Sequence, residues 1–572
     1  MRPRSWFALV ALLLPAAAHA QAPSPPPPPP PLPLQHTPQH TVPAITARDL
    51  MTRLYIFADD SMQGREAGTI GNVKGTDYIA AEIGRLGLVP AGDAGTYFQT
   101  IPLKTRTFDT TSTFAVGGAS LKAFTDYVAL GPQAVAAPSL AIVYGGELGD
   151  STHWITREQA DGKLVVLGVK GRLASVRSLR APPALSGAAA ILFIALDSLP
   201  PQLVAFVARP RGFLDDSPGG SPAMPPLFLI GRAAAARMFS TPLEQLAAGA
   251  GGASAALDVR FQVEPVPQPA RNVVGVIPGS DPKLRGEYVA IGAHNDHIGF
   301  THAPVDHDSI RIWNHVVRPE GADDARKQAT AEQQAQVNAA VAAFRAQHAG
   351  ADRLDSISNG ADDDGSGSVA ALEIAERLAS LKPKPKRSIL FVWHTGEEKG
   401  LLGSRYFTDH PTVPRDSIVG QLNMDMVGRG AADDETGRTR DSVPLHGGPR
   451  YVQLVGSRRL STELGDLIER VNTEGRHNLT FDYALDANGH PSNIYCRSDH
   501  YEYTRYGIPI TFFTTGLHSD YHQVTDEPQY IDYEHLARVA ALVADAAVRV
   551  ADLDHRVVVD HPKPDPSVPC RQ

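Results

Sequence analysis

Five continuous apolar runs constrain the fold of this 572-residue chain more than any other feature. They are RNVVGVIPG (271–279), EYVAIGAH (287–294), RSILFVWHT (387–395), VGQLNMDM (419–426) and GIPITFFTT (507–515). Apolar runs without polar alternation are typical of strands buried on both faces of a largely parallel sheet. Helical patterns separate several of them, notably at residues 366–381. We therefore predict an α/β fold with a mixed, largely parallel central sheet and helices on both faces.

A chain of this length is expected to form more than one domain. Residues 45–125 mix a helical pattern with turns and are assigned to the N-terminal part of the main domain. Residues 126–262 alternate short apolar strands with Gly, Pro and Ser turns, which predicts a separate small β-rich domain. The α/β pattern occupies residues 263–560. Within it, residues 301–357 are polar and then rich in Ala and Gln, so we expect a helical insertion there.

The N-terminus has the features of an export signal. Residues 1–20, MRPRSWFALVALLLPAAAHA, place two arginines before a short apolar run and end in a small-residue cleavage site at Ala20. The apolar run is too short to cross a membrane. The proline-rich residues 21–44 predict a stiff, extended spacer. We expect a periplasmic or secreted protein without a stable membrane anchor.

Composition limits the classes of partner and of metal site. The net charge of −9 comes from 53 basic and 62 acidic residues, and no basic stretch points to nucleic acid. The two cysteines, Cys496 and Cys570, either form a disulfide or stay as a buried thiol and a loose tail residue. Two cysteines cannot build a thiolate framework, so a metal must be held by His, Asp and Glu. Nothing in the sequence indicates the oligomeric state.

Acidic and histidine side chains follow the ends of the predicted strands, where open α/β sheets bind their ligands. They are His294 with Asp296, the pair Glu397 and Glu398, Asp425, and His518 with His522. Such nitrogen and oxygen ligands suit zinc or a related divalent ion. A bridging carboxylate could join two metal sites.

Two similar segments compete for the bridging role, NGADDDGSG at 359–367 and EGADDARKQ at 320–328. The second runs into a strongly helix-forming sequence, so we expect Asp323 and Asp324 to lie at a helix start, where acids cap free amides. Small residues follow Asp363 and permit a tight turn. We therefore favour Asp363 as the metal ligand and assign no metal role to the other segment.

Five motifs occur in the order seen in one enzyme family: GAHNDHIG, NGADDDGSG, HTGEEKGLLGSRYF, NMDMVGR and SDYHQVTDEP. Residues 50–550 thus resemble the co-catalytic dinuclear zinc aminopeptidases, which include the bacterial leucyl aminopeptidases. Relatives of that family are glutamate carboxypeptidase, glutaminyl cyclase and the transferrin receptor. The resemblance implies two zinc ions per chain and peptide substrates. It also implies that residues 126–262 are a protease-associated domain inserted into the peptidase domain.

The resemblance implies a role for each motif residue. His294 and Asp425 resemble the ligands of one metal, and Glu398 and His522 resemble those of the other. Asp363 resembles the carboxylate that bridges the two metals. Glu397 resembles the general base, which takes a proton from the attacking water.

Four further residues are expected around these ligands. Asp296 resembles the acid that orients the His294 imidazole. Asp499, His500 and Tyr521 are expected near the substrate or behind the ligands. The insertion at 301–357 separates His294 from Asp363, so it should border the active site, and we interpret it as a lid or wall that limits substrate size.

These features predict an exported zinc exopeptidase, and we favour an aminopeptidase that removes N-terminal residues from peptides. A carboxypeptidase or dipeptidase using the same metals is the main alternative, because the pocket that decides between them cannot be read from one sequence. A glutaminyl cyclase, which normally uses one zinc, and a binding protein that has lost its metals are less favoured, because the full ligand set is present.

Overall fold

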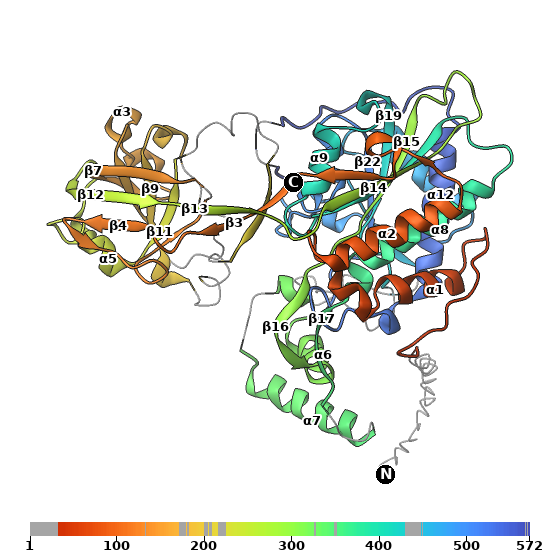
Figure 1. Ribbon diagram of the computed structural model, residues 1–572, viewed down its shortest axis with the longest axis horizontal. Coiled ribbons are helices and arrows are strands. Elements are labelled where there is room, and N and C mark those ends of the chain that lie inside the picture. The colour runs from red at the N-terminus through yellow and green to blue at the C-terminus, as the bar shows by residue number, and fades with distance from the viewer. Residues whose placement is uncertain are drawn as a thin grey trace, which may run out of the picture.

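The computed structural model describes residues 32–572 except 132, 171–178, 180–181, 200–203, 205–208, 216–224, 325–327, 348–351, 430–447, 449, 567 and 569. The expected signal peptide and the first part of the proline-rich spacer lie outside the described residues. A larger α/β body and a smaller β-rich body lie side by side in Figure 1, and a narrow sheet joins them. Among the helices described here, none combines the length and apolar character that crossing a membrane requires.

The central sheet of the larger body contains nine strands within the described residues, and the fold prediction is confirmed. Its order is β1-β14-β18-β15-β19-β22-β20-β21, with β2 paired to β14. The strands are β1 (Val89–Pro90), β2 (Phe98–Ile101), β14 (Ala270–Ile277), β15 (Tyr288–His294), β18 (Ser388–His394), β19 (Ile418–Met424), β20 (Tyr451–Val455), β21 (Thr480–Asp482) and β22 (Ile510–Thr514). The central strands β18, β15, β19 and β22 are parallel to their neighbours within this group, whereas β14 and β20 pair antiparallel with its outer strands.

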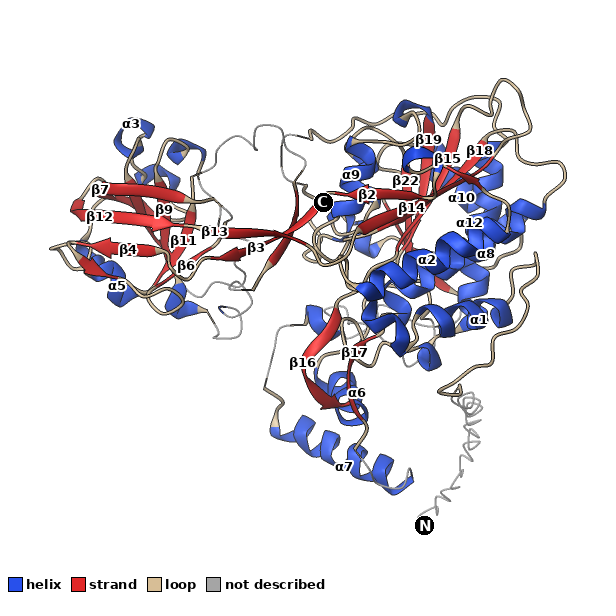
Figure 2. Cartoon of the chain, in the orientation of Figure 1, coloured by secondary structure: helices blue, strands red, loops and turns tan. Residues whose placement is uncertain are grey.

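Helices cover both faces of this sheet (Figure 2). On one face, Val289 and Ile291 of β15 pack in a core with α1 (Ala47–Phe57), α2 (Ile70–Arg85), α8 (Gly367–Ser380), α10 (Thr462–Glu474) and α12 (Tyr533–Ala551). On the other face, Ala290 packs in a core with α9 (Leu402–Asp409) and α11 (His500–Thr504). Successive residues of a strand point to opposite faces, so an unbroken apolar run is what a doubly covered strand requires.

The smaller body is built on a sheet with eight described strands in the order β5-β4-β12-β7-β8-β9-β11-β6. They are β4 (Thr113–Val116), β5 (Ala119–Ser120), β6 (Tyr127–Ala129), β7 (Val135–Glu147), β8 (Leu164–Gly168), β9 (Ala190–Ile194), β11 (Leu227–Ile230) and β12 (Gly251–Val259). This body starts earlier than the expected boundary at residue 126, because β4 pairs with β12 and Phe114 packs with Leu257 in its core. Its assignment as a protease-associated domain stays a prediction.

Three described strands form the narrow connection between the bodies. They are β3 (Leu103–Phe108), β10 (Arg211–Leu214) and β13 (Phe261–Pro265), with β3 in the middle. Figure 1 shows β3 and β13 crossing from one body to the other. Leu103 and Leu214 pack with Leu402 of the larger body, so the connection is anchored in an apolar contact there.

The expected insertion leaves the larger body as an antiparallel pair of strands, β16 (Gly299–Asp306) and β17 (Leu354–Ser358). Between them lie α6 (His307–Val317), a turn at Gly321–Asp323 and α7 (Ala331–Gln347). Figure 1 shows β16, β17, α6 and α7 projecting from the body, with α7 at the outer end.

The expectation that Asp323 and Asp324 lie at a helix start is wrong, because α7 begins only at Ala331. The Thr330 hydroxyl accepts a hydrogen bond from the Gln333 amide at 3.1 Å, and the Gln333 side chain accepts one from the Thr330 amide at 3.0 Å. This reciprocal capping box fixes the helix start at Thr330. The two acids lie in the preceding turn instead.

Cys496 and Cys570 form a disulfide with a Cα–Cα distance of 5.8 Å, which decides between the two alternatives left open by the sequence. The bond fastens the C-terminal tail to the segment that leads into Asp499. Closing a loop over a sequence separation of 74 residues restricts the unfolded chain. In the chain-entropy description this restriction is worth about 4 kcal/mol.

We expect Cys570→Ser to lower the free energy of unfolding of the larger body by about 2–4 kcal/mol. The measurement is thermal unfolding followed by circular dichroism, with the oxidised wild type and the Cys496→Ser/Cys570→Ser double variant as controls. The double variant should have the same unfolding midpoint as the single variant. Equal unfolding midpoints for Cys570→Ser and the oxidised wild type would contradict a stabilising disulfide.

Candidate metal centre

Five segments bring the candidate ligands to one edge of the central sheet. His294 is the last residue of β15, and Asp425 directly follows β19. Glu397 and Glu398 follow β18, and Asp363 lies in the turn Ala361–Ser366 that leads into α8. The loop after β22 supplies His522. Parallel strands end at the same edge, so their trailing side chains meet although they are far apart in sequence.

The first group of potential ligands contains His294, Asp363 and Asp425. The Nε2 atom of His294 lies 3.1 Å from Asp363 Oδ1 and 3.6 Å from Asp425 Oδ1. Ser498 donates a hydrogen bond to the other oxygen of Asp425 at 2.7 Å. This hydroxyl holds the Asp425 carboxylate with one oxygen turned toward His294.

Asp296 orients His294 differently from the expectation. The Nδ1 atom of His294 lies 3.0 Å from the backbone carbonyl of Asp296, whereas the Asp296 carboxylate is 3.8 Å away. The carbonyl can only accept, so Nδ1 donates to it and Nε2 is the nitrogen directed at the carboxylates. The Asp296 carboxylate instead accepts from the Glu397 amide at 3.2 Å. Burial raises the pKa of Asp296 to about 7, against the lowering effect of His294.

The second group contains Asp363, Glu398, His522 and one residue that the sequence reasoning did not assign, His297. The Nε2 atom of His522 lies 2.9 Å from Glu398 Oε2 and 3.0 Å from Asp363 Oδ2. His297 Nδ1 lies 2.8 Å from Glu398 Oε1 and 3.7 Å from Asp363 Oδ2. The second histidine of GAHNDHIG is the available signal, but the direction of the chain after β15 cannot be read from the sequence.

The donor set of the two groups fits two divalent cations that share Asp363. Within each group the potential ligand atoms lie within 4.8 Å of one another. Several are buried without a hydrogen-bond partner among the described residues, namely His294 Nε2, His297 Nδ1, Asp363 Oδ2 and Glu398 Oε1. Buried polar atoms of this kind are costly unless something compensates them, and a cation does so for lone pairs and carboxylates. Imidazole nitrogen with carboxylate oxygen is a zinc-type ligand set.

The three aspartates of NGADDDGSG, Asp362, Asp363 and Asp364, make different contacts. Asp363 points to the two groups, and its peptide bond to Asp364 is cis. The Asp364 carboxylate accepts from the amides of His294 at 3.0 Å and Gly367 at 2.9 Å. The Asp362 carboxylate accepts from the Gly428 amide at 2.7 Å. The outer two aspartates therefore fasten the turn to β15, α8 and the segment after β19.

Buried side chains from other segments complete this fastening. Asp526 accepts from the amides of Asp362 and Asp363 at 3.0 Å each. The Asp526 carboxylate thus contacts the backbone amides of the triplet and not its carboxylates. Nε2 of His518, the histidine that competed with His522 in the sequence, is buried 3.0 Å from Asp362 Oδ2. It supports the turn and belongs to neither ligand group.

Glu397 and Glu398 differ strongly in their surroundings although they are adjacent. Burial and the Asp363 carboxylate raise the pKa of Glu398, but the two imidazoles, His522 and His297, outweigh them and lower it to about 2. Burial raises the pKa of Glu397 well above its ordinary value. His294 lowers this pKa, whereas the negative charge of Glu398 raises it further. Glu398 is thus held as an anion between imidazoles, and Glu397 is the carboxylate that would readily take up a proton.

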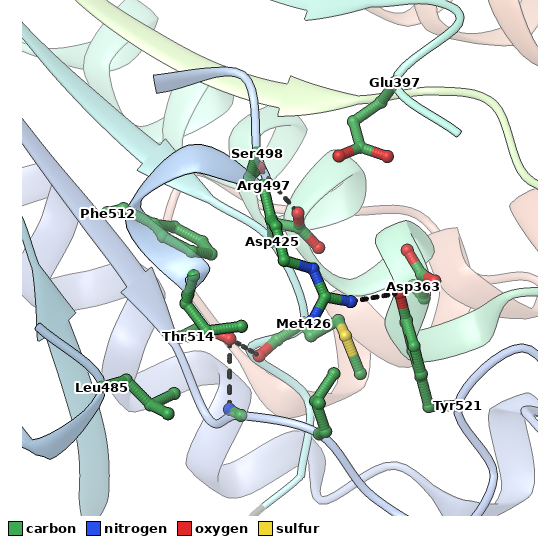
Figure 3. Close-up of a pocket in the computed structure, with 13 residues that line it drawn as sticks. Asp363, Glu397, Asp425, Met426, Leu485, Arg497, Ser498, Phe512, Thr514 and Tyr521 are labelled. Carbon is green, nitrogen blue, oxygen red and sulfur yellow. Dashed lines mark hydrogen bonds between the residues drawn. The ribbon is translucent and has the colours of Figure 1, made fainter. Parts of the chain in front are cut away.

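Two of the ligands, Asp363 and Asp425, line a pocket together with Glu397. Figure 3 shows Asp363, Glu397 and Asp425 on one side of it and apolar side chains on the other. The remaining lining residues are Met426, Leu485, Ile494, Arg497, Ser498, Phe512, Thr514, Gly516, Leu517 and Tyr521. The pocket combines a mainly apolar wall with a polar, acidic floor, as small-molecule sites usually do.

Of the three residues expected near the substrate, Tyr521 lies at the pocket and two lie behind it. The Tyr521 ring lines the pocket and stacks on His522 with ring centroids 4.0 Å apart. His500 is buried against Phe512, with centroids 4.5 Å apart, so it supports the pocket wall. Asp499 Oδ2 lies 3.4 Å from Nδ1 of the buried His394 and does not reach the ligand groups.

A third group, His307, Asp355 and Glu527, also brings its potential ligand atoms within 4.8 Å at the base of the insertion. The Arg353 guanidinium, however, lies among them and contacts His307 and Asp308. A fixed positive charge in this position compensates the carboxylates and repels a metal cation. This group is an ion-pair cluster that joins the insertion to the loop carrying His522.

The comparisons with known proteins agree with this geometry. Residues 272–547 match the profile of peptidase family M28. Leucine aminopeptidase 1 of Trichophyton rubrum is 28% identical over 202 residues, which are 34% of this chain and 48% of that protein. Leupeptin-inactivating enzyme 1 of Streptomyces exfoliatus is 41% identical over 78 residues, which are 13% of this chain and 18% of that protein. The match thus spans about half of the fungal relative.

Two solved structures are similar over most of the chain. The aminopeptidase from Aneurinibacillus sp. strain AM-1 has a TM-score of 0.48 and 17% identity, covering 91% of this chain and 98% of that chain. BSAP, a zinc aminopeptidase from Bacillus subtilis, has a TM-score of 0.42 and 16% identity, covering 88% and 94%. At these scores the family assignment rests on the sequence match alone. Residues 272–547, which match the model of peptidase family M28, include every residue of the two ligand groups described above.

Proposed function

We propose that this protein is an exported zinc aminopeptidase that removes single residues from the N-terminus of peptides. The observation that carries the proposal is the sharing of Asp363 by two groups of His and carboxylate ligands beside a pocket that Asp363 and Asp425 line. The names of the related leucine aminopeptidases support the choice of aminopeptidase. Export is supported by residues 1–20 of the sequence.

In this proposal, His294, Asp363 and Asp425 hold one zinc ion. Asp363, Glu398, His522 and the newly recognised His297 hold the other. Zinc, when bound, supplies a Lewis acid that polarises the substrate carbonyl and lowers the pKa of a water molecule. Asp296 and Ser498 keep His294 and Asp425 in the orientation that this site requires.

Glu397 is the proposed general base. It lines the pocket, belongs to neither ligand group, and has a pKa raised by burial. It takes one proton from the water that attacks the carbonyl and gives that proton to the departing amine, so the scissile C–N bond breaks without a net proton change. The Asp296 carboxylate holds the Glu397 backbone in place at 3.2 Å.

The choice of a substrate amine over a substrate carboxylate rests on the related leucine aminopeptidases. Asp363 and Asp425 are metal ligands in this proposal, so zinc would compensate their negative charge at the pocket. The apolar wall, including Met426, Ile494 and Phe512, suits an uncharged side chain such as leucine. One observation favours the carboxypeptidase alternative, because Arg497 also lines the pocket and could bind a carboxylate.

We expect the protein to hydrolyse C-amidated peptides and to leave N-acetylated peptides intact. The acetyl group blocks the free N-terminal amine that an aminopeptidase needs, whereas amidation changes only the far end. Mass spectrometry of a leucine-headed tetrapeptide in its free, acetylated and amidated forms is the measurement. Cleavage of the acetylated form with loss of activity on the amidated form would instead establish a carboxypeptidase.

Glu397→Ala should keep about two zinc ions per chain and lower kcat on leucine p-nitroanilide by about 10²–10⁴-fold, since proton transfer contributes this much to catalysis. Metal content measured by mass spectrometry and steady-state kinetics check both parts. Glu398→Ala serves as the matched comparison, because it should release zinc. A Glu397→Ala enzyme with wild-type kcat would refute the general-base role.

His297→Ala should reduce bound zinc from about two ions to about one per chain, because the second group loses a nitrogen ligand. His302→Ala is the matched control, since His302 lies in the same region of the chain and is exposed. Both variants are dialysed against the same zinc-buffered solution before metal analysis. An unchanged zinc content and zinc affinity in His297→Ala would remove this residue from the ligand set.

A further inference from the structure

The turn Gly321–Asp323, between α6 and α7 of the insertion, returns to the pocket. The Ala322 amide donates to the Tyr521 carbonyl at 3.1 Å. Gly321 has a φ of +57°, and a Cβ there would lie 2.7 Å from the carbonyl oxygens of His518 and Tyr521. Only glycine permits this approach, so the turn is fitted closely to the loop that carries His522.

The turn places Asp323 against Arg497 in a two-pronged ion pair. Arg497 Nη1 lies 2.9 Å from Asp323 Oδ2, and Nη2 lies 3.1 Å from Oδ1. The side chains are 24% and 31% exposed respectively, so the pair is largely shielded from water. Parallel hydrogen bonds between guanidinium and carboxylate fix both groups in orientation.

Arg497 also belongs to the pocket. It is the one basic residue among the described residues that line it. Its Nη2 lies 3.4 Å from the Tyr521 hydroxyl, and Figure 3 shows the guanidinium beside Asp425 and Tyr521. An uncompensated guanidinium in this position would attract the carboxylate of an acidic substrate residue and oppose an apolar one.

The neighbouring Asp324 makes a different contact. Its Oδ2 atom accepts from the Glu320 amide at 3.0 Å, which closes the turn on itself. The two aspartates of the GADD segment at 321–324 are therefore separable: one is directed at the pocket and the other at the local backbone. This difference supplies a matched control within a single motif.

We propose that Asp323 is a specificity-determining residue that neutralises Arg497 and thereby keeps the pocket selective for uncharged side chains over acidic ones. The proposal rests on the aminopeptidase function proposed above. Asp323 acts through Arg497 and touches no reacting atom, so it is a positioning residue. The insertion thus supplies a counter-charge to the specificity pocket from outside the α/β body.

The test uses the zinc-loaded full chain and compares kcat/KM for leucine p-nitroanilide with kcat/KM for glutamate p-nitroanilide. Asp323→Asn removes the charge and retains the shape of the side chain. We expect it to shift the ratio toward glutamate by about fivefold to tenfold, the size of one partly shielded charge interaction. The dissociation constants of the products L-leucine and L-glutamate, measured by calorimetry, should shift in the same direction.

Two controls isolate the interaction. Asp324→Asn should leave the ratio unchanged. In an Arg497→Met background, Asp323→Asn should have no effect on the ratio, because the charge that Asp323 neutralises is gone.

An equal loss for both substrates in Asp323→Asn, with an unchanged ratio, would overturn the proposal, since it indicates a structural role only. So would the same ratio shift in the Arg497→Met background. The wild-type activity on leucine p-nitroanilide tests the aminopeptidase function itself, and the ratio between variants tests Asp323, so the two failures are distinguishable.

Discussion

The carboxylate of Asp363 is the constraint on which the site depends. It lies 3.1 Å from Nε2 of His294 and 3.0 Å from Nε2 of His522, and it belongs to both ligand groups. A buried carboxylate with acidic neighbours is unfavourable unless positive charge compensates it. One histidine ends β15 and the other lies in the loop after β22, so the position of this one side chain decides whether two groups form or only one.

Much of the surrounding structure serves to hold the turn that carries Asp363. The buried Arg65 donates to the carbonyls of Asn359 at 2.6 Å and Gly360 at 2.8 Å. Burial lowers the pKa of this guanidinium to about 10, against the raising effect of nearby aspartates, and it remains a cation at neutral pH. Asp364 and Asp526 bind backbone amides around the same turn. A geometry fixed from both sides costs little reorganisation when a charged ligand binds.

The insertion extends this arrangement to the far side of the pocket. At its base, His307 and Arg353 join it to the loop after β22 through Glu527. At its turn, Asp323 reaches Arg497, and Ala322 binds Tyr521, the neighbour of His522. The sequence indicated that the insertion borders the active site. These contacts hold the insertion against Arg497 and Tyr521, which line the pocket, whereas α7 extends away from the body (Figure 1). The role of the insertion as a lid or wall stays a prediction.

The sequence by itself determined the sheet and the choice of candidate ligands. Buried parallel strands require unbroken apolar runs, and polar side chains at their ends have to meet at one edge. The resemblance of the motifs to the zinc aminopeptidases then named His294, Asp363, Glu398, Asp425 and His522 as the expected ligands. Only the tertiary structure decided the rest. His297 joins the second group because the chain turns after β15, the Asp296 carbonyl holds His294 in place of its carboxylate, and Asp323 meets Arg497 across 174 residues. Local sequence patterns cannot predict such pairs, because periodicity carries no information about which distant segments come into contact in the fold.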